Sequence, residues 1–147
     1  QLSLMYSKKD DPVAVHYFDN ALRINSQSIE ALYGKSLFLQ EHGQPEKALE
    51  GYRKILELDK NYFIAYFNMG FVNLVYLENF TEAINNFSKA IELNPKYFEA
   101  WCNRGIAYEK MKDLKQAEAD FRKALEIQPD YAPAAKGISR VVDKDFE

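Results

Sequence analysis

The chain has 147 residues, of which 47% are hydrophobic and 28% are charged, a composition typical of a globular protein rather than a disordered one. Its formal net charge of −3 and the absence of a dense run of Lys and Arg argue against nucleic acid as the main partner. No apolar run is long enough for a transmembrane helix, so this fragment is not expected to insert into a membrane, and the single cysteine excludes an intrachain disulfide.

The first predicted element is a lone helix over about residues 12–24, whose partner helix is either absent or reduced to residues 1–7. Together these segments form a partial unit over about residues 1–28. Because the chain begins with Gln rather than Met, we interpret it as a fragment or a processed product. A lone helix here lacks the neighbour that would cover its outer face, so this end is a candidate for self-association.

A repeat of two helices follows along the chain. Its marker is an alanine that recurs after 34, 35 and 34 residues and is followed four residues later by an aromatic residue. These markers are Ala14, Ala48, Ala83 and Ala117, with Phe18, Tyr52, Phe87 and Phe121. Small residues let paired helices approach closely, and aromatic rings fill the space beside them. The pattern predicts three full units over residues 29–62, 63–97 and 98–131.

The middle unit contains one extra residue. Thirteen residues separate Gly70 from Ala83, whereas the equivalent spacing in the other two full units is twelve. The segment 74–77 is therefore expected either to extend its helix or to bulge, and both would alter the local surface.

The last predicted element is a capping helix over about residues 132–143, within a segment of about 132–145. A cap needs one face toward the array and one toward water. The residues expected to face the array are Ala134, Ala135, Ile138, Val141 and Val142. Those expected to face water are Lys136, Arg140 and Lys144.

The third full unit carries the clearest family pattern, formed by Trp101, Gly105, Tyr108, Ala117, Phe121 and Pro129. With these residues the chain resembles the tetratricopeptide repeat family over about residues 11–145, and only Arg104 departs, where that family usually has Leu. The resemblance implies an all-α fold, a right-handed superhelical array of antiparallel helix pairs in a single domain over residues 1–147. That solenoid would hold three full repeats, a partial N-terminal repeat and a C-terminal capping helix.

Catalytic patterns are not found in the sequence. His16 and His42 have no His or Cys at metal-ligand spacing, and there is no glycine-rich phosphate loop. Acidic residues recur near the start of the second helix of each full unit, where they stabilise the helix dipole. They are Glu46, Glu82 and Glu118. We therefore predict a protein that is not an enzyme and that uses no cofactor and no metal.

The resemblance implies that the first helix of each unit lines a concave groove where a protein or peptide ligand binds. The predicted groove residues are Tyr33, Leu37, Ile64, Phe67, Asn68, Phe71, Glu99, Cys102, Asn103 and Ile106. Apolar and aromatic side chains would form its floor, and a partly acidic margin would come from Glu30, Gln40, Glu99 and Glu109. Cys102 has no basic neighbour in sequence and is expected to be a passive small side chain rather than a nucleophile.

The leading hypothesis is a scaffold or adaptor that binds an apolar or amphipathic peptide or helix of another protein in this groove. One alternative is an oligomerisation or assembly module of a larger protein that acts through the N-terminal end. Another is a regulatory region of an enzyme domain outside this fragment. Family members that bind chaperone tails hold a carboxylate with basic residues, but Tyr33, Leu37 and Glu99 stand at those places, so that ligand is disfavoured. The compartment stays open: cytoplasmic by default, or periplasmic or extracellular if a targeting segment has been removed.

Overall fold

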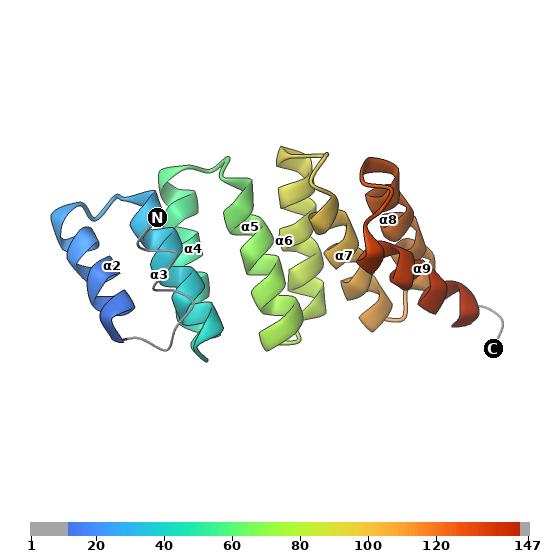
Figure 1. Ribbon diagram of the computed structural model, residues 1–147, viewed down its shortest axis with the longest axis horizontal. Helices are drawn as coiled ribbons and strands as arrows, with labels where there is room; N and C mark the ends of the chain where they lie inside the picture. The colour runs from blue at the N-terminus through green and yellow to red at the C-terminus, as the bar shows by residue number, and fades with distance from the viewer. Residues whose placement is uncertain (1–11, 145–147) are drawn as a thin grey trace. The chain divides into compact units, whose positions relative to one another are not determined.

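The computed structural model describes residues 12–144, which form α-helices and one π-helix and contain no strand (Figure 1). The chain divides into two compact units, Gln1–Ala65 and Tyr66–Glu147. The expectation of one domain over residues 1–147 stays a prediction, and the expected segment 1–7 lies outside the described residues. None of the described helices is long and apolar enough to span a membrane.

The helices alternate with short turns along both units. The first unit holds α2 (Pro12–Ile24), α3 (Ile29–Glu41), α4 (Pro45–Leu58) and the beginning of α5 (Phe63–Phe71). The second holds the rest of α5, the π-helix η1 (Val72–Tyr76), α6 (Phe80–Leu93), α7 (Phe98–Lys110), α8 (Leu114–Ile127) and α9 (Ala132–Lys144).

Local sequence signals fix where several helices begin. The side chains of Ser28, Asn79 and Asp113 accept hydrogen bonds from backbone N–H groups three residues later, at 3.2, 3.4 and 3.3 Å. These caps satisfy donors that have no partner within the first helical turn. The turn before α4 uses Gly43 at a φ of +77°, followed by Pro45 in the first turn of the helix.

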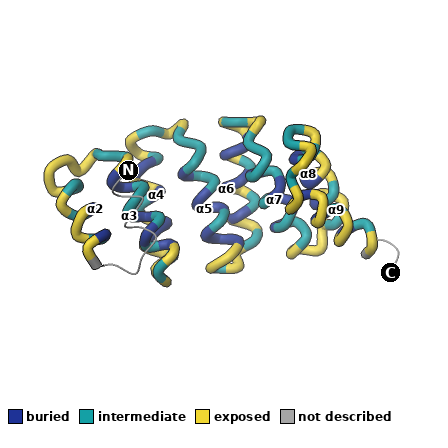
Figure 2. The backbone as a smooth tube through the Cα atoms, in the orientation of Figure 1, coloured by how far each residue is buried: buried dark blue, intermediate teal, exposed yellow. Residues whose placement is uncertain are grey.

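A glycine of the first helix packs on an aromatic ring of the second helix in two successive pairs of the second unit. A Cβ at Gly70 would lie 2.7 Å from ring atoms of Phe87, and one at Gly105 would lie 2.9 Å from the ring of Phe121. Phe87 and Phe121 are both fully buried, and Figure 2 shows buried positions along α5 and α6. Only the missing side chain allows the helices to approach this closely, which explains the small residues in the repeat.

The extra residue of the middle unit is absorbed by a π turn. In η1 the N–H of Leu77 donates to the carbonyl of Val72, five residues earlier, at 3.1 Å. Buried Asn73 donates to Met69 O at 3.1 Å and to Asn86 Oδ1 of α6 at 2.9 Å. Of the two outcomes expected from the spacing, the structure adopts the bulge, and the extra residue changes the hydrogen-bond pattern without breaking the helix.

The capping helix α9 matches the expectation in part. Ala134 and Val141 are fully buried, and Ile138 and Val142 pack against the same cluster. The prediction for Ala135 is wrong, because that residue lies on the exposed side of the helix. Lys136 faces water as expected, and Lys144 has no described side chain.

Arg140 of α9 does more than face solvent. Its Nε and Nη2 atoms donate to the two carboxylate oxygens of Glu109 on α7, at 3.0 and 2.8 Å. A bidentate contact of this kind fixes orientation as well as adding energy. The ion pair therefore helps to hold the cap on α7.

Candidate functional site

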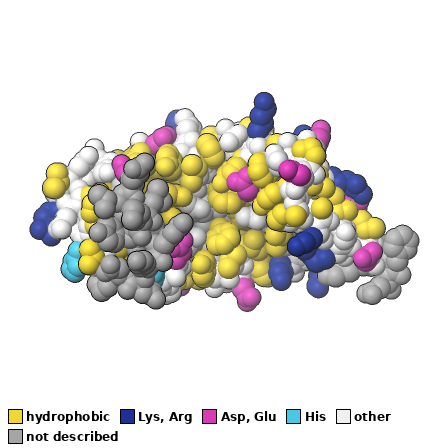
Figure 3. Space-filling view, in the orientation of Figure 1, with side chains coloured by type: hydrophobic (Ala, Val, Ile, Leu, Met, Phe, Trp, Pro, Cys, Tyr) yellow, Lys and Arg dark blue, Asp and Glu magenta, His cyan; other side chains and the backbone are white. Residues whose placement is uncertain are grey.

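An apolar hollow of about 300 Å³ opens in the second unit beside the π turn. We call it the α5–α7 hollow, and its apolar lining is Phe71, Leu74, Val75, Phe80 and Ile106. Its polar lining is Glu78, Asn103 and Lys110. Hydrophobic side chains are also prominent over this part of the molecule in the face shown in Figure 3.

Three of the predicted groove residues, Phe71, Asn103 and Ile106, come together in the α5–α7 hollow. Phe71 ends α5, and the other two lie three residues apart on α7, so both helices present one face to the same space. Phe71 and Ile106, both predicted for the groove, therefore contribute apolar surface to one hollow, and Asn103 lies beside them.

The π turn supplies hollow residues that the sequence analysis did not single out. Val75 is 50% exposed, and neighbouring Tyr76 is also exposed, with its ring edge-on to Phe71 at a centroid distance of 6.1 Å. Val75 and Tyr76 thus extend the apolar lining of the hollow, and it is contiguous apolar surface of this kind that marks an interaction site. The extra residue in the spacing from Gly70 to Ala83 was the available signal, but it did not show which side chains would turn outward.

Phe67 and Asn68 lie deeper than the groove prediction requires. The Phe67 ring contacts the rings of Phe87 and Tyr97 at centroid distances of 5.7 and 4.8 Å, within the packing of α5 and α6. Asn68 is buried, so its placement on an accessible surface is wrong. Phe67 belongs to the structural support of the site, because its ring contacts are made to other parts of the second unit.

The prediction that Cys102 lines a groove is also wrong. Its side chain is fully buried with Phe121, Ala134 and Val141, because α9 covers this side of α7. Burial raises the pKa of the Cys102 thiol to about 11, so the thiolate required of a nucleophile does not form near neutral pH.

The acidic margin is weaker than expected. Glu109 is engaged by Arg140, and its side chain is mostly buried. Burial raises the pKa of Glu99, against hydrogen bonds that act to lower it, so the environment disfavours its charged form. Gln40 does not lie at a margin at all, because it is buried and accepts a hydrogen bond from the Tyr52 hydroxyl at 2.7 Å.

The remaining predicted residues, Tyr33, Leu37 and Ile64, belong to the first unit. All three are partly exposed. The Tyr33 ring lies 6.3 Å from that of Tyr52 and 6.4 Å from that of Tyr62, measured between centroids, so it packs on its own unit. Their role in binding stays a prediction.

Arg104, the residue that departs from the family pattern, forms an ion pair with Asp120 on the next helix. Its Nε and Nη2 atoms each donate to a carboxylate oxygen of Asp120 at 2.8 Å, and Nη1 donates to Ser88 Oγ at 3.1 Å. The guanidinium also lies 5.0 Å from the Trp101 ring centroid. Burial raises the pKa of Asp120, and Arg104 opposes that shift by stabilising the carboxylate. Sequence analysis missed this pair because its members lie on different helices.

Metal binding finds no support in the described part of the chain: residues 12–144 contain no group of three His, Cys, Asp or Glu side chains placed to hold an ion. The lining of the α5–α7 hollow instead suits contact with the apolar side chains of a ligand.

Comparisons with known proteins identify the family. Two family models described as tetratricopeptide repeats match residues 29–62 and 98–131, and one described as a TPR repeat matches residues 73–112. The first two ranges coincide with predicted units. The chain belongs to the tetratricopeptide repeat family, with the all-α solenoid fold of that family. The number of full repeats stays a prediction.

Solved structures agree with this fold. The crystal structure of MamA is 24% identical, with 90% of this chain and 77% of that chain covered and a TM-score of 0.83. The first TPR of Spaghetti (RPAP3), bound to an HSP90 peptide, is 23% identical, with coverage of 84% and 97% and a TM-score of 0.78. At these identities the likeness shows the fold alone.

YrrB, described as a TPR protein with an unusual peptide-binding site, is 28% identical, with 84% of this chain and 63% of that chain covered and a TM-score of 0.75. These matches indicate no enzymatic family. No curated protein matches the sequence.

Proposed function

We propose that this chain is a non-catalytic protein-interaction scaffold that binds an apolar or amphipathic segment of another protein in the α5–α7 hollow. The observation that carries the proposal is the hollow itself, whose lining is largely apolar and includes half-exposed Val75 at the π turn. Exposing apolar surface of this kind to water costs free energy, which is regained when a partner covers the surface.

The dimensions favour a side-chain anchor over a small-molecule ligand. A cavity of about 300 Å³ is at the lower limit of small-molecule sites, and it is shallow enough to leave Val75 half exposed. One large apolar side chain of a partner would fill much of it, and anchors of this type contribute most of the energy of many interfaces. Asn103 offers both a donor and an acceptor for the partner backbone.

The charges at the rim are mixed, with Glu78 and Lys110 both lining the hollow. This balance favours a partner segment that is apolar at its centre and not strongly charged overall. RPAP3 and YrrB support peptide binding as the class of activity, since the first is bound to an HSP90 peptide and the second has a peptide-binding site. A chaperone-type acidic tail remains disfavoured here, because Glu99 stands where a basic residue would be needed.

A photo-crosslinking experiment tests the proposal. A photoreactive amino acid at Val75 in the rim should capture a protein from an extract of the source cells, and the same group at exposed Lys89 of α6 should not. In competition, the unlabelled natural chain should displace that protein, and a Val75→Glu variant should not. Val75 is preferred to Phe67 and Ile106 for this test because those two residues pack in the core clusters.

The proposal is wrong if the protein captured at Val75 is displaced equally well by the Val75→Glu variant. Circular dichroism melts of the natural chain and the variant provide the control for folding. Since Val75 is half exposed, its substitution should move the melting temperature little.

A second candidate function, assembly through the N-terminal end, is favoured by the apolar residues on α2. Ile24 is 90% exposed, and Tyr17 is also exposed. Light scattering over a range of concentrations tests this alternative. A mass that rises with concentration and falls back in an Ile24→Lys variant would support it, and a constant monomer mass would exclude it.

A further inference from the structure

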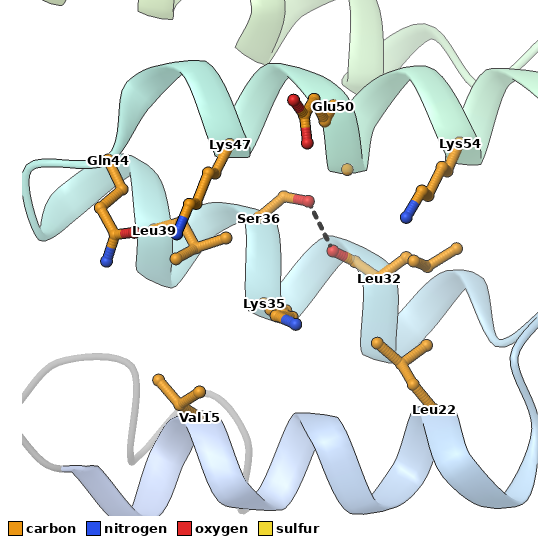
Figure 4. Close-up of a pocket in the computed structure, with 11 residues that line it drawn as sticks. Val15, Leu22, Leu32, Lys35, Ser36, Leu39, Gln44, Lys47, Glu50 and Lys54 are labelled. Carbon is orange, nitrogen blue, oxygen red and sulfur yellow. Dashed lines mark hydrogen bonds between the residues drawn. The ribbon is translucent and has the colours of Figure 1, made fainter.

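The first unit contains a separate hollow of about 370 Å³ between α2, α3 and α4 (Figure 4). We call it the α2–α4 hollow. Four aliphatic side chains line it, Val15, Leu22, Leu32 and Leu39. Three lysines and one carboxylate also line it, Lys35, Lys47, Lys54 and Glu50. Its lining therefore combines an apolar floor with an excess of positive charge, although the whole chain is acidic.

One wall of the hollow differs in sequence from the equivalent place in the other two full units. Gly51 precedes Tyr52 of α4, and the residues at the equivalent place in the other two full units are Asn86 and Asp120. Those two side chains are buried and hydrogen-bonded. Beside Gly51 the corresponding space holds the Ser36 side chain, because a Cβ on Gly51 would lie 1.9 Å from Ser36 Oγ. At this wall the first unit therefore has a hydroxyl and a glycine, where the other two full units have a glycine and a larger polar side chain.

The lysines of α4 are available to a ligand. Within residues 12–144 neither Lys47 nor Lys54 has an ion-pair partner, and Lys35 is bound to Asp19 at 2.7 Å. The equivalents of Lys54 in the next two units, Lys89 and Lys123, are each paired with a glutamate three residues later. In Figure 4 the amino groups of Lys47 and Lys54 extend from α4 toward α3.

We propose that the α2–α4 hollow binds an acidic segment of a partner protein, with an apolar side chain on the aliphatic floor and carboxylates on Lys47 and Lys54. The occupant follows from charge complementarity, because the floor requires apolar atoms and the rim provides unpaired ammonium groups. Glu50 opposes one of the three ammonium groups and leaves the lining net positive. This site is distinct from the α5–α7 hollow and does not depend on it.

The helix geometry sets the spacing of the carboxylates. Lys47 and Lys54 are seven residues apart on α4, which corresponds to about 10.5 Å along the helix axis. An extended peptide advances about 3.3 Å per residue and its side chains alternate between two faces, so acidic side chains four residues apart lie on one face about 13 Å apart. The flexible lysine side chains span the difference, and an apolar residue midway between the two acidic residues points the same way, over the floor.

The probe is a fluorescein-labelled peptide, GSEDLFDEGS, whose binding to the whole chain is followed by fluorescence anisotropy. Two control peptides separate the contributions: GSQNLFNQGS replaces the carboxylates by amides, and GSEDSSDEGS removes the apolar pair. The natural chain should bind the acidic peptide about tenfold more tightly than the amide peptide, which is the effect of two exposed ion pairs together. It should bind the peptide without apolar residues more weakly than the acidic peptide, and added salt should weaken the acidic peptide most.

The variant Lys47→Gln/Lys54→Gln should weaken the acidic peptide by about tenfold and leave the amide peptide unchanged. Lys60→Gln, which removes an exposed lysine that does not line the hollow, is the matched control and should have little effect. A second variant, Ser36→Gly/Gly51→Asn, places in this unit the residues found in the next one and should weaken binding, because a longer amide side chain replaces a hydroxyl at the wall of the hollow.

Three results would overturn the proposal. They are no binding of the acidic peptide to the natural chain, equal binding of the acidic and amide peptides, and equal effects of the paired lysine variant and Lys60→Gln. The lysine variant keeps the test valid even if the Ser36→Gly/Gly51→Asn variant does not fold, because both lysines are exposed.

Discussion

Replacing Arg104 by Leu, the residue usual in the family, should lower the free energy of unfolding by about 3 kcal/mol. The reason is the carboxylate of Asp120, whose side chain is 3% exposed and which receives two hydrogen bonds from the guanidinium. Without Arg104 this carboxylate would stay buried without its charge partner. We take the lower end of the range of about 3–5 kcal/mol for a broken buried pair, because the Arg104 side chain is 17% exposed and partly screened by solvent.

The double variant Arg104→Leu/Asp120→Ala distinguishes the cost of an unpaired charge from the value of the pair. It should be more stable than Arg104→Leu alone, because it removes the uncompensated carboxylate. Urea denaturation followed by circular dichroism gives the free energies. Arg122→Leu is the matched control on α8, where Arg122 is 61% exposed and bound to Glu118, and it should cost no more than about 0.5 kcal/mol.

The same variant should show a pH dependence of known sign. With Arg104 removed, burial raises the pKa of Asp120 without opposition from the guanidinium, so the folded state binds a proton more readily than the unfolded state. The stability lost in Arg104→Leu should therefore be partly regained as the pH falls from neutral toward the ordinary pKa of aspartate, about 3.9. A variant as stable as the natural chain at neutral pH, or a double variant less stable than Arg104→Leu, would refute the reasoning.

Three further predictions concern buried contacts. Burial raises the pKa of the Cys102 thiol to about 11, so a thiol-specific reagent should leave it unmodified at about pH 8 and react only in denaturant. Full labelling of the folded chain would contradict this burial. Gln40→Leu removes the acceptor of the buried Tyr52 hydroxyl, so it should lower the free energy of unfolding in a urea titration by about 1 kcal/mol or more. Adding Tyr52→Phe should recover much of that loss, and a larger loss in the double variant would count against this account. Gly70→Ala should cost about 1–3 kcal/mol in thermal melts, because the new methyl group would lie 2.7 Å from ring atoms of Phe87, and an unchanged melting temperature would show that the helices can separate without loss.

Much of the fold could be predicted because the repeat combines local signals with strong steric constraints. Capping side chains such as Asn79 and Asp113 act within one helical turn, so their effect is visible in a short stretch of sequence. The fixed spacing of glycine and aromatic residues also indicates a close helix pair, and the packing of Gly70 on Phe87 confirms it.

The residues of the candidate site were harder to predict from the sequence than the fold. Helical periodicity groups residues on one face but does not reveal what covers that face. Cys102 shares a face of α7 with Asn103 and Ile106, yet α9 buries the cysteine while the other two line the α5–α7 hollow. A first helix in such an array has neighbours on several sides, and small angular differences decide which side chain stays accessible.

The sequence by itself determined the class of protein, the order of its helices and the small-to-aromatic packing, because each of these follows from residues that lie within one or two helical turns or recur at a fixed interval. Only the tertiary structure decided that the extra residue forms a π turn, that Arg104 pairs with Asp120, and that a lysine-rimmed hollow opens between α2, α3 and α4. These features depend on which side chains of separate helices meet. That choice is made by packing among many neighbours, whose combined effect the periodicity of one helix does not contain.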